Sequence, residues 1–267
     1  MRLPIYQVDA FTDTLFGGNP AAIVPMDAFP QDTLMQAIAQ ENNLAETAFI
    51  VPQGADYHLR WFTPAVEVPL CGHATLASAA VVLERLRPQD DRVVFHTLSG
   101  PLTVRREQGD YILDFPARPA TRVPDDPILA QALGVQPLEL WANDFTCMAV
   151  LESEAQVRDV QPDMRALLQS GREACIVTAP GSGRFDFVSR FFAPGHGIDE
   201  DPVTGSAHCA LMPYWAPRLG KDRLLAYQAS ARGGVLDCHL RGDRVALRGQ
   251  AVFYLEGTIT LPSVQPA

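Results

Sequence analysis

Two short segments of this sequence carry residue types that could do chemistry, and the two resemble each other. One is Leu70-Cys71-Gly72-His73-Ala74-Thr75, and the other is Val203-Thr204-Gly205-Ser206-Ala207-His208. Each opens a run of small and apolar residues that predicts a helix, so Gly72 and Gly205 lie at helix starts, where unpaired N–H groups can bind anions. The two segments are about 133 residues apart, and the same spacing relates Gly100 to Gly233 further along. The repeat therefore predicts two related halves, each with one anion-binding helix start.

Two carboxylates near these helix starts are candidates for acid/base work. Glu46 begins an apolar run, Glu46-Thr47-Ala48-Phe49-Ile50, whose burial would raise the carboxyl pKa toward the operating pH. When Ala174-Cys175 is aligned with Ala48-Phe49, Arg172 takes the place of Glu46, and the second half has no matching carboxylate. Asp201 precedes the second helix start, where it could orient His73 or Ser206 or shuttle a proton. A solvated strand-end acid and an ordinary turn acid are the alternative interpretations of Glu46 and Asp201.

Cys71 and the histidines allow two further kinds of site. A helix N-terminus lowers the pKa of a thiol, so Cys71 could be a nucleophile or a proton-transfer group; a small structural cysteine is the alternative. His73 and His208, with Glu200 and Asp201 nearby, supply metal-ligand types, but their spacing matches no zinc or two-histidine signature. We therefore expect no metal site.

Composition narrows the class of protein. The chain has 267 residues, 47% of them hydrophobic and 19% charged, which is typical of a soluble globular protein. Its net charge of −10 argues against a nucleic-acid partner. The longest apolar run, around residues 74–83, falls far short of the roughly 20 residues that span a membrane, and the first residues lack a signal-peptide core. Five scattered cysteines favour a reducing cytoplasm.

The elements that would position these residues follow the repeat. Central helices are expected over residues 74–86 and 207–215, each preceded by strands and followed by a hairpin, at Gly109-Asp110 and at Gly242-Asp243. The pattern predicts an α+β fold with two pseudo-symmetric halves, residues 1–118 and 128–267. A proline-rich linker, residues 119–127, would join them, with the candidate active site in the cleft between the halves. An arrangement in which the C-terminal strand completes the first half stays open.

Longer motifs give the chain a resemblance to a known family. They are Val8-Asp9-Ala10-Phe11-Thr12, Phe16-Gly-Gly-Asn-Pro-Ala-Ala22, Glu46-Thr-Ala-Phe49, Arg60-Trp-Phe-Thr-Pro64, Glu67-Val-Pro-Leu-Cys-Gly-His-Ala-Thr75 and Glu200-Asp-Pro-Val-Thr-Gly-Ser-Ala-His208. In this order and over nearly the whole chain, they resemble the PhzF-like family of phenazine biosynthesis, which is related in fold to diaminopimelate epimerase and proline racemase.

The resemblance implies a cofactor-independent isomerase, usually a homodimer, whose halves each curl a mostly antiparallel sheet around a central helix. The family glutamate that moves a proton within a cyclohexadiene carboxylic acid matches Glu46. The substrate-holding residues match His73, Asp201 and Ser206, with backbone contacts from Gly72 and Gly205.

Two rival functions stay open at this stage. In the epimerase and racemase relatives two cysteines face each other, whereas here Cys71 holds the first position and Thr204 the second. This difference disfavours two-thiol racemisation and favours a 1,3-type proton shift on a small carboxylated substrate. A cysteine-dependent amino-acid epimerase or racemase is one rival, and a non-catalytic small-molecule binding protein is the other.

Overall fold

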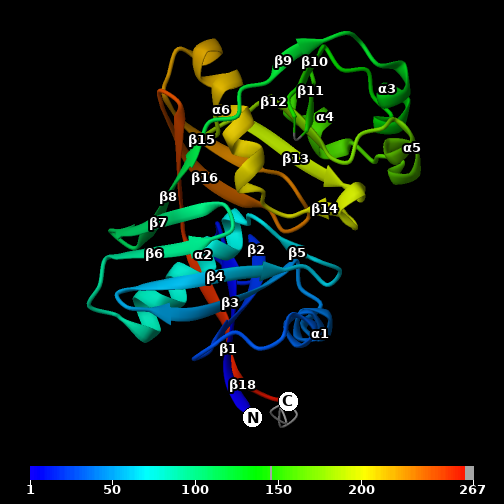
Figure 1. Cartoon of the computed structure of the whole chain (residues 1–267). Coiled ribbons are helices and arrows are strands. Elements are labelled where there is room, and N and C mark those ends of the chain that lie inside the picture. Colours follow the sequence, from blue (N-terminus) through cyan, green and yellow to red (C-terminus); the bar gives the residue numbers. More distant parts are fainter. Residues whose placement is uncertain (145, 262–267) are drawn as a thin grey trace. The chain divides into compact units, whose positions relative to one another are not determined.

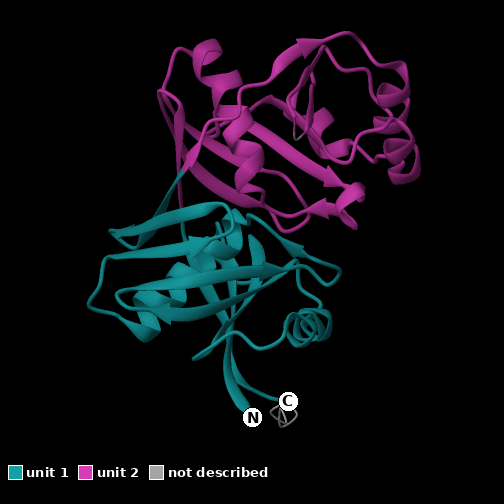
Figure 2. Cartoon of the chain, viewed as in Figure 1, with its two compact units in different colours: residues 1–114, 249–267 teal, residues 115–248 magenta. Residues whose placement is uncertain are grey.

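The computed structural model describes residues 1–144 and 146–261, so residues 145 and 262–267 of the expected second half lie outside the described residues. The chain divides into two compact units (Figure 2). Unit 1 comprises residues 1–114 and 249–267, and unit 2 comprises residues 115–248.

Unit 1 is a mostly antiparallel sheet with a central helix (Figure 1). Its strands are β1 (Arg2–Ala10), β2 (Asn19–Pro25), β3 (Glu46–Gln53), β4 (Asp56–Phe62), β5 (Glu67–Val68), β6 (Arg92–Thr97), β7 (Gly100–Glu107), β8 (Asp110–Pro116), which crosses the unit boundary, and β18 (Ala251–Thr260). Its helices are α1 (Asp32–Asn42) and α2 (Gly72–Val81), and a π-helical turn, Val82–Leu86, continues α2. All residues from His73 to Val81 are buried, as expected for a helix that is apolar on every side.

Unit 2 has the same plan. Its strands are β9 (Thr121–Val123), β10 (Glu139–Ala142), β11 (Cys147–Val150), β12 (Cys175–Pro180), β13 (Phe187–Ala193), β14 (Ile198–Asp201), β15 (Arg223–Gln228), β16 (Gly234–Arg241) and β17 (Arg244–Gly249). Its helices are α3 (Pro127–Leu133), α4 (Glu154–Asp159), α5 (Met164–Gln169) and α6 (Gly205–Leu219), with a 3₁₀ turn at Pro194–His196. The central helix α6 packs against β15 and β16 of its own unit.

The strand pairings confirm the repeat that the sequence predicts. In unit 1, β2 pairs with β3 in parallel, β3 with β4 antiparallel and β4 with β6 in parallel. In unit 2, β11, β12, β13 and β15 pair in the same order and with the same directions. The buried central helix has the same place in the chain order of each unit: α2 follows β5 and precedes β6, and α6 follows β14 and precedes β15. The fold is therefore α+β, with two related halves.

The unit boundaries differ from the expected residue ranges at both ends of unit 2. Residues 119–127, expected to be a linker, contain strand β9, which pairs with β10. At the other end, β18 groups with unit 1 because it pairs antiparallel with β1, from Arg2 opposite Thr260 to Ala10 opposite Ala251.

Sheet register also corrects the alignment of Glu46 with Arg172. Thr47 pairs with Phe62, two residues after Arg60, and Cys175 pairs with Phe192, two residues after Arg190. Since the two arginines are equivalent in the repeat, the residue that matches Glu46 is Ala174. The second half still has no carboxylate at this position.

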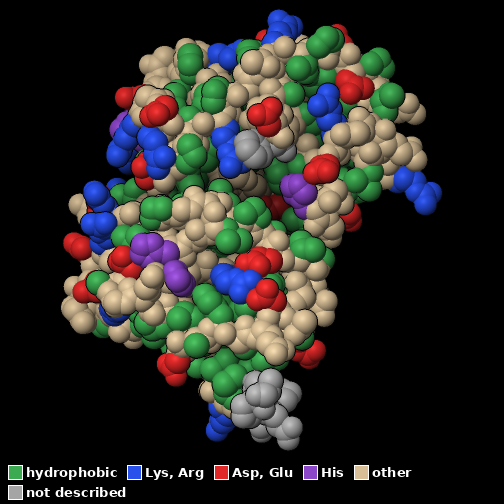
Figure 3. Space-filling model, in the orientation of Figure 1, with side chains coloured by type: hydrophobic (Ala, Val, Ile, Leu, Met, Phe, Trp, Pro, Cys, Tyr) green, Lys and Arg blue, Asp and Glu red, His purple; other side chains and the backbone are tan. Residues whose placement is uncertain are grey.

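On the face shown in Figure 3, Lys and Arg side chains lie in separate groups among acidic and uncharged ones, so this face has no basic stripe. Within residues 1–144 and 146–261, no helix is long and apolar enough to cross a membrane.

One buried histidine helps to hold the start of α6. His208 Nδ1 lies 2.8 Å from the Thr204 carbonyl oxygen, and the equivalent bond in α2 runs from the Thr75 hydroxyl to the Cys71 carbonyl. His208 is fully buried, and burial lowers its pKa to about 4. It is therefore neutral in the folded protein, with Nδ1 donating the hydrogen bond.

We predict that His208 makes the protein acid-sensitive. The unfolded chain takes up a proton near pH 6.5 and the folded protein only near pH 4, so the contribution of His208 to stability is complete above pH 6.5. It is lost as the pH falls toward 4, and it amounts to about 3 kcal/mol. His208→Thr, which copies Thr75, should flatten the dependence of the unfolding free energy on pH across this window. Urea unfolding at several pH values measures the slope, and equal slopes in both proteins would contradict the prediction.

Candidate functional site

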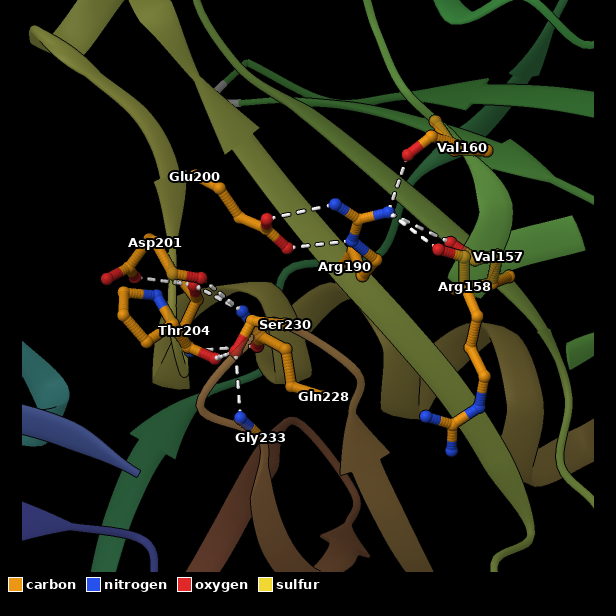
Figure 4. A network of polar contacts seen from close by, with 11 residues as sticks. Val157, Arg158, Val160, Arg190, Glu200, Asp201, Thr204, Gln228, Ser230 and Gly233 are labelled. Carbon is orange, nitrogen blue, oxygen red and sulfur yellow. Dashed lines mark hydrogen bonds and ion pairs between the residues drawn. The ribbon is translucent and has the colours of Figure 1, made fainter. Parts of the chain in front are cut away.

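An arginine–glutamate pair fixes the segment before each central helix. Arg60 on β4 binds Glu67 on β5 through two hydrogen bonds of 2.7 and 2.6 Å. Arg190 on β13 binds Glu200 on β14 in the same way, at 2.8 and 2.9 Å (Figure 4). Two parallel bonds between a planar guanidinium and a carboxylate fix direction as well as distance. The segment that leads into α2 and the segment that leads into α6 are therefore each held by the same kind of ion pair within their own unit.

A serine makes a second repeated contact. The Ser99 hydroxyl donates to the Pro69 carbonyl at 2.8 Å, two residues before Cys71. The Ser230 hydroxyl donates to the Pro202 carbonyl at 2.8 Å, two residues before Thr204. These bonds join the turn after β6 or β15 to the loop that enters the helix, so each helix start is held from two sides.

In unit 1 the helix start meets Glu46. His73 Nε2 lies 2.9 Å from Glu46 Oε2, and the two side chains are only 4% and 15% exposed. On the other side of the ring, Asn19 Nδ2 lies 3.0 Å from His73 Nδ1. The Cys71 sulfur lies 3.4 Å from Nδ1 and 4.0 Å from Nε2. The structure thus brings two predicted residues, Glu46 and His73, into direct contact.

Burial and the neighbouring Glu46 carboxylate disfavour a reactive thiolate at Cys71. Burial, reinforced by Glu46, raises the pKa of Cys71 to about 11, which outweighs any effect of the helix N-terminus. Burial opposes a charge on His73, but Cys71 and Glu46 favour it and raise the His73 pKa well above its usual range. Cys71 contributes to this rise only as a thiolate, which is absent at neutral pH. At neutral pH two opposing effects therefore act on His73: burial favours the neutral ring, and Glu46 favours the protonated ring.

The same cluster contains the atoms that could ligate a metal. One ligand atom each from Glu46, Cys71 and His73 lie within 4.8 Å of one another, a donor set that zinc accepts. Each of the three already contacts a protein partner: Glu46 contacts His73 Nε2, and Asn19 and Cys71 contact the Nδ1 side of the ring. These contacts among protein atoms hold the cluster together.

In unit 2, Gln228 locks the turn before α6 (Figure 4). The Thr204 N–H donates to Gln228 Oε1 at 2.8 Å, so the other end of the amide, Nε2, must be the donor. Nε2 donates to the Asp201 carbonyl at 2.7 Å and to Thr204 Oγ1 at 3.1 Å. The Thr204 hydroxyl therefore donates to Asp201 Oδ2, at 2.5 Å. Gln228 is fully buried, so every bond of this set is shielded from water.

These contacts leave both helix starts without a side-chain cap. Threonine often caps the helix that follows it, but the Thr204 hydroxyl is committed to Asp201, and neither Thr204 nor Cys71 caps its helix. The first N–H groups of α2 and α6, from Gly72 and from Gly205 onward, are thus placed to bind an anionic group. Ser206 is exposed although Gly205 and Ala207 on either side are buried.

The predicted site residues fall into two sets. Glu46, Gly72 and His73 belong to unit 1, and Asp201, Gly205 and Ser206 surround the start of α6 in unit 2. Asn19 and Gln228 also belong to these sets, although the sequence did not point to either of them. Asn19 stands in a Gly-Gly-Asn-Pro segment that predicts only a loop, and nothing in the local sequence distinguishes Gln228.

Comparison with known proteins places the chain in a family. The family model described as "Phenazine biosynthesis-like protein" (PhzC-PhzF) matches residues 8–257. The chain belongs to the PhzC-PhzF family. An uncharacterized isomerase of Pseudomonas aeruginosa is 51% identical over 98% of this chain and 100% of the relative.

Solved structures extend the comparison. The crystal structure of a PhzF-family protein from Enterococcus faecalis matches with a TM-score of 0.95 and 44% identity, covering 98% of this chain and 100% of that one. A hydroxyproline epimerase from Agrobacterium vitis, with bound trans-4-hydroxy-L-proline, matches with a TM-score of 0.65 and 10% identity, covering 98% of this chain and 94% of that one. At that identity the epimerase shares the fold alone. The family and its epimerase-like fold, both expected from the sequence, are confirmed.

We predict that Gln228→Leu destabilises unit 2. The substitution keeps the approximate shape but leaves the Thr204 N–H and the Asp201 carbonyl without their buried partner, at a cost of about 1–3 kcal/mol. Gln53→Leu on the exposed end of β3 is the matched control, with an expected change within about 0.5 kcal/mol. Urea unfolding measures both, and equal effects would contradict the role of Gln228.

Proposed function

We propose that this chain is an isomerase that moves a proton within a small carboxylated substrate, with Glu46 as the acid/base. The observation that carries the proposal is the 2.9 Å contact between Glu46 and His73 in a nearly water-free setting. A carboxylate held there can take a proton from a carbon acid, while a neighbouring imidazole orients it and stabilises its charge.

Removal of a proton from carbon leaves an electron pair on the substrate, and the resulting negative charge must be stabilised. When the C–H bond breaks, its electrons pass into the system conjugated with the substrate carboxylate, and negative charge builds on oxygen. Uncapped N–H groups at a helix start stabilise such charge without having to reorganise. We assign this role to the N–H groups at Gly72 and Gly205, and substrate binding to His73, Asp201 and Ser206. Glu46 then returns the proton to a second carbon, which completes a 1,3-type shift.

The state of Cys71 favours this account over a cysteine-dependent racemase. A racemase of that kind needs a thiolate on one face of the substrate and a thiol on the other. Here the pKa of Cys71 is about 11, and the equivalent position holds Thr204, whose hydroxyl is committed to Asp201. One acid/base residue, Glu46, remains.

Location and assembly are part of the same proposal. All five cysteines are free and buried, which supports a reducing cytoplasm. A homodimer is proposed from the family resemblance alone, and light scattering on the purified protein tests it.

The proposal is tested by following solvent deuterium. A thermal-shift screen of small carboxylic acids, including hydroxyanthranilates and amino acids, first finds compounds that stabilise the protein by mass action. NMR of each hit in D2O should then show deuterium entering the compound with the wild-type protein. Glu46→Gln should bind the same compound but slow this exchange by about 10²–10⁴-fold. Stabilisation without exchange in the wild type would support a binding protein instead.

We predict that Cys71 is dispensable. Cys71→Ser should keep deuterium exchange within a few-fold of the wild-type rate, and a haloacetamide should modify Cys71 slowly at neutral pH because the thiol is protonated and only 6% of the residue is exposed. Mass spectrometry of the treated protein reports the modification. Rapid alkylation with matching loss of exchange would favour the racemase.

A further inference from the structure

Two buried cysteines that the proposed mechanism does not use lie side by side in unit 2. Cys147 on β11 and Cys175 on β12 stand directly opposite each other in the parallel pairing of these strands. Both belong to the same cluster of buried residues, so their side chains point to the same face of the sheet. Both are free, and the two residues are only 2% and 0% exposed. Strand pairing thus makes neighbours of two thiols that are far apart in the sequence.

The sulfur of Cys147 is directed toward the neighbouring strand. It lies 3.5 Å from the carbonyl oxygen of Ala174, the residue immediately before Cys175. The sulfur of Cys175 lies 3.5 Å from the carbonyl oxygen of Ile176 on its own strand. A thiol is only a weak hydrogen-bond donor, so neither contact strongly opposes movement of one sulfur toward the other.

The two thiols differ in acidity. When Cys147 loses its proton, the Cys175 thiol donates to the thiolate, and this bond lowers the pKa of Cys147 although burial opposes the change. The Arg172 guanidinium acts in the same direction as the bond. The same bond, together with burial, raises the pKa of Cys175 well above its usual range. Because the thiolate is the nucleophilic form, Cys147 is the sulfur suited to react first.

The strand pairing permits a disulfide bond between these positions, but not a relaxed one. Neighbouring strands lie about 4.7–4.9 Å apart, which is within the range of about 4.4–6.8 Å between the Cα atoms of a disulfide. Side chains at the same level of a parallel pair have their Cβ atoms about one strand spacing apart, whereas a relaxed disulfide needs about 3.5–4.5 Å. The bond would therefore be strained, and strained disulfides are easily reduced.

We propose that Cys147 and Cys175 form a redox-active pair that hydrogen peroxide converts into a reversible disulfide. The Cys147 thiolate attacks one oxygen of the peroxide, so that an S–O bond forms, the O–O bond breaks, and the other oxygen leaves as water after taking up a proton. The Cys175 sulfur then attacks the Cys147 sulfur, so that an S–S bond forms, the S–O bond breaks, and the second oxygen leaves as water. The two sulfurs lose two electrons, and the peroxide gains them.

The oxidant can reach the pair at a strand end. Cys147 is the first residue of β11, and the ends of strands open locally at a lower free-energy cost than their centres. Hydrogen peroxide is little larger than a water molecule, so a small opening is enough.

The repeat shows that the fold does not require this pair. The equivalent positions of unit 1 hold Ala22 on β2 and Thr47 on β3, which stand opposite each other in the same parallel pairing. Neither residue reacts with peroxide, so the pair belongs to unit 2 alone. The inference does not rest on the proposed function, because neither Cys147 nor Cys175 is among the residues assigned to proton transfer or substrate binding.

The test is treatment of the folded, fully reduced protein with hydrogen peroxide. The remaining thiols are then blocked with N-ethylmaleimide in denaturant, and mass spectrometry is applied to the intact and the digested protein. The wild type should lose two of its five alkylation sites, and one linked pair of peptides should join Cys147 to Cys175. Glutathione added to the folded protein before blocking should restore all five sites, because the bond is strained.

Three variants identify the sulfurs involved. Cys147→Ala copies the alanine of unit 1 and should abolish the linked peptides. Cys175→Ser removes only the second sulfur, so Cys147 should stop at the sulfenic acid, which dimedone traps. Cys238→Ala is the matched control, since Cys238 is a fully buried cysteine of unit 2 that stands opposite Leu224 and Leu247, and it should leave the linkage unchanged.

Two results would overturn the inference. One is a peroxide-treated wild type in which Cys147 and Cys175 are both still alkylated and no linked peptides are found. The other is a linkage that glutathione does not reduce, which would show a relaxed structural disulfide. If Cys147→Ala does not fold, the peptide map of the wild type decides alone.

Discussion

The contact between Glu46 and His73 is the interaction on which the rest of unit 1 depends. A carboxylate and an imidazole that are both almost shielded from water interact more strongly than they would at the surface, but only if their positions are fixed. The surrounding elements supply that fixation. Strand β3 begins at Glu46, α2 begins one residue before His73, and β2 brings Asn19 to the far side of the ring. The Arg60–Glu67 pair holds the segment that leads to the helix.

The scaffold occurs twice in the chain, but the residues to which we assign acid/base chemistry occur in one copy only. The arginine–glutamate pairs, the serine–proline carbonyl bonds and the missing helix caps recur in both units. Around this shared frame the reactive positions differ, with His73 matched by Ser206 and Cys71 by Thr204. In unit 2 the polar residues Gln228 and Thr204 orient Asp201 instead, an arrangement suited to binding. The proposed division of labour follows from these substitutions.

Local signals in the sequence predicted much of this arrangement. Glycine before a run of small residues marks a helix start, so both α2 and α6 could be found from the repeat, and contiguous motifs predicted the family. Contacts between distant residues could not be found in this way. Asn19 and Gln228 act through amides whose partners lie 54 and 24 residues away, and a single amide has no periodic pattern. The pKa of Cys71 rises because the thiol is buried, and the spacing of residues in the sequence does not reveal how deeply a side chain is buried. Different loop lengths in the halves hid the match between Glu46 and Ala174.

The central claim is that Glu46 and His73 act as one unit, and a double-mutant cycle on the rate of deuterium entry tests it most directly. Glu46→Gln, His73→Gln and the double variant are compared with the wild type on one exchanging compound. Residues that act as a unit give non-additive losses. The account predicts that either substitution removes most of the rate and that the second adds little. Losses that multiply in the double variant would contradict it, because they would show two independent contributions.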